Sequence, residues 1–162
     1  MKEQRRARRI AMSAAERDAF LQEERTCRVA TLSPDGPHVT PLSYVWHQET
    51  LWLYSITRSQ RWTDLQRDPR VAVVVDAGPS YFELRGVEMV GRVEMIGEQP
   101  RTGEQVPELE VPERMFAQRY GSALTAEGRM ALDGRHAWVR LRPTKIVSWD
   151  FRKLAALRAE AE

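Results

Sequence analysis

Short apolar runs separated by turn-forming or polar residues make up most of this chain. Runs of this kind predict strands over residues 28–32, 38–47, 51–55, 71–75, 81–97, 136–142 and 145–149. Turn-forming segments lie between several of them, as in SPDGP after Leu32 and AGPS after Asp76. Short strands at close spacing with few helices favour a mainly β fold with flanking helices. We expect a six-stranded antiparallel split barrel rather than a parallel sheet.

Two of the predicted strands contain residues that disturb a regular ladder. Pro41 lies within residues 38–47 and has no N–H to donate, which predicts a sheet edge or a bulge there. Gly86 and Gly91 interrupt residues 81–97, which is typical of a strongly bent strand in a barrel.

Three helices are also predicted. Ser13 and Glu16 have the spacing of a capping box and open a helix over residues 13–25. A second, short helix ends near Arg67, and a third runs over residues 112–121, with a proline near its start and a glycine at its end.

The length and composition indicate a soluble globular protein. The chain has 162 residues, of which 42% are hydrophobic and 30% charged, and we expect a single domain at residues 13–154. Residues 1–12 are predicted to form a flexible basic tail, and residues 155–162 a C-terminal tail. The apolar runs are far shorter than the roughly 20 residues that cross a bilayer. No apolar segment follows the basic start as in a signal peptide, so we expect a cytoplasmic protein.

Several classes of site are disfavoured by the sequence. The formal net charge is only +2, with much of the excess in the first nine residues, so a nucleic-acid partner is not expected. A single cysteine, Cys27, excludes an intrachain disulfide and a cysteine-rich zinc site. His38, His47 and His136 lie on different predicted strands without paired spacing, so no metal site is expected.

The most distinctive chemical feature is a basic, hydroxyl-rich loop between the predicted strand 51–55 and the helix after it. The loop carries Thr57, Arg58, Ser59 and Arg61. The start of a helix offers free backbone N–H groups and a positive dipole end, which suit an anion such as phosphate. Arginine presents a planar fork of donors to phosphate oxygens, and hydroxyls complete the shell. Basic residues beside a helix start are also common on solvated surfaces, so this loop alone leaves both readings open.

The order of residues resembles the pyridoxamine 5'-phosphate oxidase-like superfamily of FMN-binding split barrels. The segments that carry the resemblance are ATLSPDGPHVTPL, TRSQRWTDLQRDPRV and RLRPTKIVSWDF, within about residues 10–154. The chain is most similar to the actinobacterial branch that uses the deazaflavin coenzyme F420. The resemblance implies a homodimer with a cofactor site at the subunit interface.

The resemblance also implies which residues bind the cofactor. The phosphate-binding positions of the family match Thr57, Arg58, Ser59 and Arg61, where many relatives have lysine at the last position. Ring-contacting positions match Pro41, Leu42, Ser43 and Tyr44 on one strand and Tyr54, Ser55 and Ile56 on the next. Trp149 matches a tryptophan that reaches the site from the partner subunit. Because the ring carries out the hydride chemistry, no catalytic residue is expected.

Three functions are compatible with these features. The first is an F420-dependent reductase that transfers hydride to a small unsaturated acceptor. The second is an FMN-dependent oxidase or reductase, and the third is a carrier of a cofactor or tetrapyrrole without turnover. The extra arginines favour the first, because F420 has a longer anionic tail. We expect the acceptor to contact the loops at residues 98–111 and 122–134.

Overall fold

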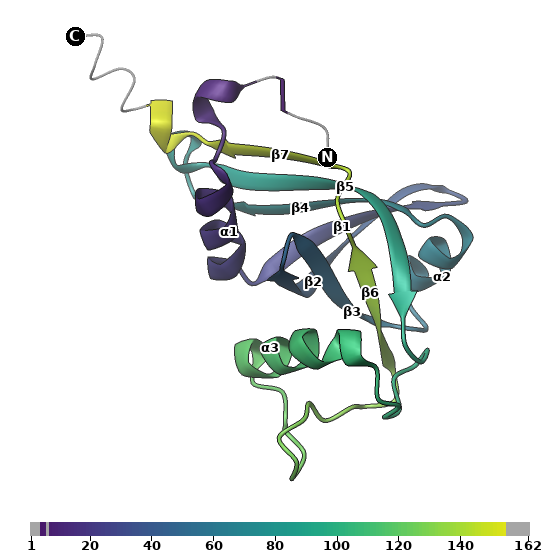
Figure 1. Ribbon diagram of the computed structural model, residues 1–162. Coiled ribbons are helices and arrows are strands. Elements are labelled where there is room, and N and C mark those ends of the chain that lie inside the picture. Colours follow the sequence, from purple (N-terminus) through teal and green to yellow (C-terminus); the bar gives the residue numbers. More distant parts are fainter. Residues whose placement is uncertain (1–3, 6, 155–162) are drawn as a thin grey trace, which may run out of the picture.

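The computed structural model describes residues 4, 5 and 7–154 of the chain (Figure 1). Its strands are β1 (Thr26–Ser33), β2 (Gly36–His47), β3 (Thr50–Ile56), β4 (Arg70–Ala77), β5 (Arg85–Ile96), β6 (His136–Leu141) and β7 (Lys145–Asp150). Its helices are α1 (Ala14–Glu23), α2 (Gln60–Arg67) and α3 (Glu110–Tyr120), with the short 3₁₀ helices η1 (Arg8–Ile10), η2 (Tyr81–Glu83) and η3 (Pro107–Leu109). None of the described helices is both long enough and apolar enough to cross a membrane.

Six of these strands close into an antiparallel barrel, which confirms the predicted fold class. The pairing runs from β1 through β2, β3, β6, β5 and β4 back to β1. The long strand β5 pairs with β6 through its last residues and with β7 through its first, so β7 continues the line of β6 along the same edge. This arrangement gives β5 the bent course that its glycines predicted (Figure 1).

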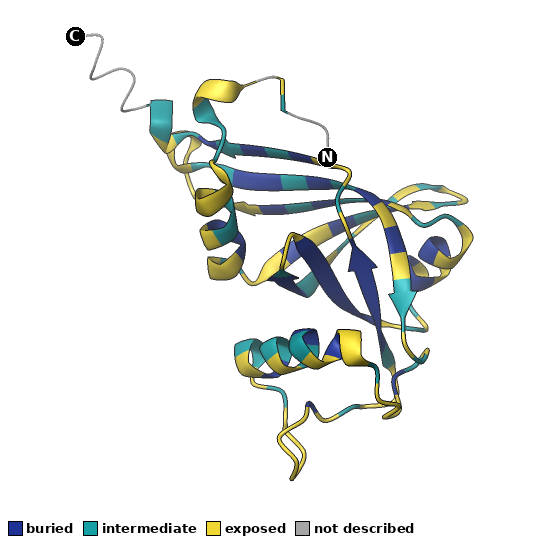
Figure 2. Cartoon of the chain, viewed as in Figure 1, coloured by how far each residue is buried: buried dark blue, intermediate teal, exposed yellow. Residues whose placement is uncertain are grey.

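The apolar residues form two clusters, one on each side of the barrel wall. The larger cluster fills the barrel and is closed at one end by Phe20 and Leu21 of α1. The smaller one lies between the outer face of the wall and α3, and is built around Trp52, Tyr54 and Trp138. Strands β3 and β6 are therefore buried on both faces, as their almost continuous burial shows (Figure 2).

The predicted boundaries lie within two residues of the observed ones, except at the start of the strand predicted over residues 81–97. Residues 81–97 were predicted as one strand, but η2 occupies its first three residues and β5 begins at Arg85. Tyr81 and Phe82 are exposed, so the apolar pattern there does not mark a core strand. Helix α3 begins at Glu110, two residues earlier than predicted, and Pro112 lies in its first turn, where no backbone N–H is required.

The capping box at the start of α1 forms as predicted. Ser13 Oγ accepts a hydrogen bond from the Glu16 N–H at 3.2 Å, and Glu16 Oε2 accepts one from the Ser13 N–H at 2.7 Å. The segment before α1 contacts β7, because the Gln4 side chain exchanges two hydrogen bonds with the Ser148 backbone. The predicted C-terminal tail at residues 155–162 lies outside the described residues.

Strands β2 and β3 separate partway along their length. They pair only from Tyr44↔Leu53 to His47↔Thr50. Beyond this point Tyr54–Ile56 pair with β6, and Gly36–Ser43 pair with β1 on their other edge. Within the described chain, that part of β2 therefore has no strand on the side facing β3. We call this opening the β2/β3 gap.

Candidate functional site

The loop that joins β3 to α2 is held rigidly at the mouth of the β2/β3 gap. The Thr57 backbone N–H and side-chain hydroxyl both donate to the Arg135 carbonyl, at 2.9 and 3.0 Å. Ser59 caps α2, because its Oγ accepts from the Trp62 N–H at 3.2 Å and donates to the Ile56 carbonyl at 2.8 Å. The two hydroxyls predicted as anion ligands are therefore engaged in shaping the loop. What the loop presents to an anion is the positive end of α2.

Arg61, in the first turn of α2, extends its guanidinium across the β2/β3 gap. Nε and Nη2 donate to Ser55 Oγ on β3 at 3.2 and 3.1 Å, and Nη1 donates to Thr40 Oγ1 on β2. Only 6% of the residue is exposed. Among the described residues no carboxylate pairs with it, and burial lowers the pKa of the guanidinium. A buried cation without a counterion is costly, and an anionic ligand would remove that cost.

Two further arginines line a hollow beside this loop. Arg58 and Arg135 are exposed, and neither forms a salt bridge within the described part of the chain. The hollow has a volume of about 380 Å³ and is lined by Ile56, Thr57, Arg58, Pro100, Gly134 and Arg135. It extends the positive charge of the loop away from Arg61.

A second hollow, which we call the ring hollow, lies on the other side of the turn that precedes β6. Its volume is about 290 Å³, and it is lined by Leu42, Ser43, Tyr54, Phe116, Ser122, Met130, Ala131, Asp133 and His136. Three of the predicted ring-contacting residues, Leu42, Ser43 and Tyr54, thus meet in one place. Pro41 and Ile56, also predicted, are exposed at the neighbouring strand edges. A hollow with both apolar and polar walls beside an unpaired strand edge can take a flat ring and offer it backbone donors.

Two other predicted residues, Tyr44 and Trp149, have side chains that lie elsewhere in the fold. The Tyr44 side chain is fully buried, and its hydroxyl lies 2.8 Å from the carbonyls of Leu21 and Glu24 at the end of α1. Trp149 is half-buried on β7 and covers Gly86 of β5 in its own chain. Its predicted contact with the site of a partner subunit remains a prediction.

The turn before β6 contributes residues that the sequence analysis did not select. Gly134 and Arg135 line the first hollow, and Asp133 and His136 line the ring hollow. His136 was considered only as a metal ligand. The spacing of an aspartate three residues before a histidine, immediately ahead of a predicted strand, was the available signal.

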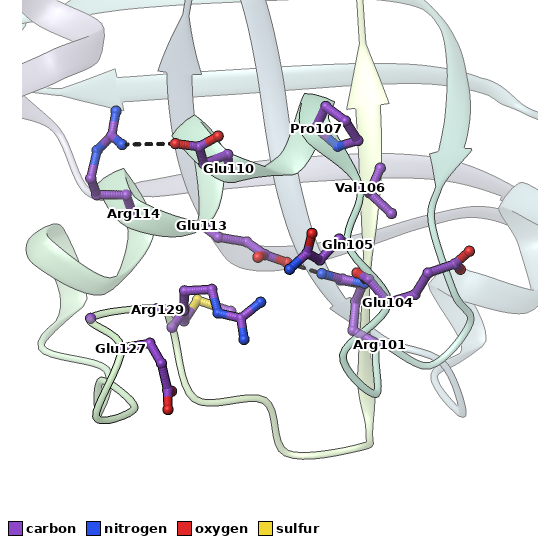
Figure 3. Close-up of a pocket in the computed structure, with 12 residues that line it drawn as sticks. Arg101, Glu104, Gln105, Val106, Pro107, Glu110, Glu113, Arg114, Glu127 and Arg129 are labelled. Atoms are coloured by element: carbon purple, nitrogen blue, oxygen red, sulfur yellow. Dashed lines mark hydrogen bonds and ion pairs between the residues drawn. The ribbon is translucent and has the colours of Figure 1, made fainter.

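Another hollow, with a volume of about 440 Å³, lies under α3 (Figure 3). Its walls come from α3 and the predicted acceptor loops, and they include Arg101, of which 3% is exposed. Arg101 is neutralised by Glu98 and Glu113, each at 2.9 Å. Arg114 and Glu110 pair at 3.6 Å on the rim (Figure 3). The buried guanidinium of this hollow therefore already has carboxylate partners, which Arg61 lacks among the described residues.

Known proteins share the fold of this chain. A family model described as pyridoxamine 5'-phosphate oxidase matches residues 13–150. The crystal structure of the conserved hypothetical protein Rv2991 from Mycobacterium tuberculosis is similar, with a TM-score of 0.75 and 31% identity, over 95% of this chain and 93% of that one. An F420 reductase has a TM-score of 0.57 and 24% identity, over 80% of this chain and 94% of that one. HutZ, the heme storage protein from Vibrio cholerae, has a TM-score of 0.64 and 18% identity, over 83% and 94% of the two chains. No curated protein sequence matches the chain.

Proposed function

The chain belongs to the pyridoxamine 5'-phosphate oxidase family, and on that premise we propose that it is a reductase that uses the deazaflavin coenzyme F420. In this proposal the coenzyme phosphate binds at Arg61, its ring lies in the ring hollow, and hydride passes to a small unsaturated acceptor. The observation that carries the proposal is the buried Arg61 guanidinium, whose only partners in the described chain are hydroxyls.

The charge around Arg61 favours F420 over FMN. FMN ends at its phosphate, whereas F420 continues into a longer anionic tail. Arg58 and Arg135 line the hollow next to the phosphate site and have no carboxylate partner among the described residues. Two unpaired guanidinium groups at that position can neutralise further anionic groups of the tail. The F420 reductase among the structural relatives shares the fold and is consistent with this choice.

The residues of this chain have positioning roles in the proposed reaction. The bound coenzyme supplies the hydride, and the protein supplies placement, electrostatics and exclusion of water. Arg61 fixes the phosphate from the β2/β3 gap. The open edge of β2 at Leu42 and Ser43 offers backbone groups to the ring, and Tyr54 closes the hollow from β3.

Titration of the purified protein with F420 and, separately, with FMN tests the proposal. We expect F420 to bind with a shift in its visible absorbance and a change in its fluorescence, and to bind more tightly than FMN. Tight FMN binding with no F420 binding would instead support the FMN-dependent function. Reduced coenzyme that binds but passes no hydride to enones, quinones, nitroaromatics or biliverdin in single-turnover assays would support a carrier.

A further inference from the structure

Asp133 and His136 form a hydrogen-bonded pair at the edge of the ring hollow. His136 Nδ1 lies 2.6 Å from Asp133 Oδ2. The other carboxylate oxygen, Oδ1, accepts the backbone N–H groups of Arg135 and His136, at 2.9 and 3.1 Å. Partial burial would raise the pKa of Asp133, but these hydrogen bonds outweigh burial and lower it. The carboxylate is thus fixed in place and orients the imidazole ring.

The remaining ring nitrogen of His136 is available. Nε2 has no hydrogen-bond partner in the part of the chain that the structure describes, and the ring lines the hollow. The His136 side chain is 25% exposed. Because a hydrogen bond to Asp133 occupies Nδ1, proton exchange with a ligand or with solvent takes place at Nε2.

Tyr54 supplies a second donor beside His136. Its ring stacks on the imidazole with a centroid separation of 4.7 Å and an interplanar angle of 22°. Only 9% of Tyr54 is exposed, and its hydroxyl has no hydrogen-bond partner within the described residues. An orphaned buried hydroxyl costs stability unless a ligand satisfies it. Tyr54, which carries this hydroxyl, also lines the ring hollow.

We propose that the ring hollow also holds the acceptor, that the acceptor is a conjugated carbonyl compound, and that His136 protonates it. This inference rests on the proposed function, because the reduced deazaflavin is the hydride donor. Tyr54 donates a hydrogen bond to the carbonyl oxygen, and Asp133 is a positioning residue that acts through His136.

Atoms and electrons balance when the acceptor receives a hydride from the coenzyme and a proton from His136. Hydride forms a C–H bond at the β-carbon of the acceptor, and the C=C π electrons move toward the carbonyl oxygen. The His136 imidazolium transfers its Nε2 proton to that oxygen, and the resulting enol then tautomerises to the saturated carbonyl. The acceptor gains two electrons, the deazaflavin loses two, and solvent returns a proton to His136.

The first experiment uses no coenzyme. 4-Nitrophenol, whose phenolate oxygen mimics the developing negative charge, is titrated into the protein and followed by its visible absorbance. We expect His136→Gln and Tyr54→Phe to weaken binding about tenfold or more, the range for loss of one hydrogen bond to a charged group. His47→Gln, which replaces a histidine outside the hollow, should bind like the unsubstituted protein. Equal binding by His136→Gln would overturn the acceptor site.

The second experiment measures hydride transfer from bound reduced F420 to cyclohex-2-enone in a single turnover. Loss of a positioned general acid typically slows a reaction by about 10²-fold or more, which we expect for His136→Gln with coenzyme affinity unchanged. A rate within threefold of the unsubstituted protein would rule out proton donation by His136. For Asp133→Asn, ¹⁵N shifts of the His136 ring should show a change of tautomer, because the amide presents an N–H to Nδ1.

The two experiments separate the inference from the proposed function. If neither F420 nor FMN binds, the proposed function fails, yet the nitrophenol titration still decides whether His136 and Tyr54 form a site. If F420 binds and transfers hydride equally well in His136→Gln, the proposed function stands and the inference fails.

Discussion

Two buried arginines differ in what surrounds them, and that difference distinguishes a binding residue from a structural one. Arg101 is 3% exposed and contacts the carboxylates of Glu98 and Glu113. Arg61 is 6% exposed, and its side-chain hydrogen bonds within the described residues all go to the hydroxyls of Ser55 and Thr40. A buried charge whose counterion is supplied by the fold is already satisfied, and one without it gains from a ligand.

Replacement of Arg61 by methionine should separate binding from stability. We expect Arg61→Met to weaken coenzyme binding by about 1.5–3 kcal/mol, or about 10- to 150-fold, the scale of a hydrogen bond to a charged group. Without coenzyme it should melt no lower than the unsubstituted protein, because an apolar side chain replaces a buried unpaired charge. Arg70→Met, at an exposed arginine paired with Asp68, is the matched control. Fluorescence titration and thermal unfolding give both quantities, and unchanged affinity would place the phosphate elsewhere.

Asp64 of α2 is predicted to make stability depend on acidity. It is fully buried and accepts hydrogen bonds from three side chains, those of Thr31, Gln60 and Arg67. Burial would raise its pKa, but these bonds lower it below the ordinary value of 3.8. A lowered folded-state pKa stabilises the protein above the unfolded-state value, and the gain is lost as pH falls through the folded-state value.

Asp64→Asn should therefore reduce the free energy of unfolding by about 1–3 kcal/mol at neutral pH, the cost of a disrupted buried hydrogen-bond network. The difference from the unsubstituted protein should shrink as the pH falls below about 3.8, where the carboxylate of the unfolded chain becomes protonated. Urea denaturation of both proteins at neutral pH and at about pH 3 measures this difference in the free energy of unfolding. Asp35→Asn, at an exposed turn, should show no such dependence. A pH-independent difference would contradict the assignment.

At the scale of elements, β7 packs against β5 through Gly86 and the indole of Trp149. Gly86 and Trp149 are direct cross-strand partners. A Cβ at Gly86 would lie 2.1 Å from Trp149 Cζ2, so the indole must move to admit it. We expect Gly86→Ala to destabilise the protein by about 1–3 kcal/mol through overpacking. In a Trp149→Phe background the cost should be smaller, which a double-mutant cycle on unfolding free energies measures. Equal costs in both backgrounds would show that the indole does not occupy this space.

Elements with strong local patterns could be predicted from the sequence, whereas contacts made by tertiary packing could not. The capping box of α1 and the apolar run of β4 are local, and both form as predicted. Residues 81–84 have the composition of a strand, but exposure and the 3₁₀ turn override it. The burial of Arg61 depends on where β2 leaves β3, which no local pattern encodes. The Tyr44 side chain likewise turns to α1 instead of the site for reasons of packing.

At the scale of the whole molecule, the open side of the barrel carries apolar residues without cover. Val39 of β2 is 59% exposed, and Ile56 at the end of β3 is 45% exposed. Both flank the β2/β3 gap, where the side of β2 that faces β3 has no strand partner within the described chain. Unpaired strand edges beside exposed apolar side chains are typical sites of association. The family resemblance implies a homodimer, and this uncovered apolar side is where we expect a second copy of the chain to bind.

We therefore predict that the protein is a homodimer whose interface covers this side and completes the coenzyme site. Val39→Glu should give a monomer by sedimentation and should also lose coenzyme affinity, because a charge at an apolar interface is left desolvated and unpaired. Leu124→Glu is the matched control, since Leu124 is 56% exposed but lies in the loop between α3 and β6. It should remain dimeric and bind coenzyme normally. A monomeric protein that binds F420 tightly would show that one chain forms the whole site, and Trp149 would then have no role in a neighbouring subunit. A Val39→Glu variant that remains dimeric would show that the interface lies elsewhere on the molecule.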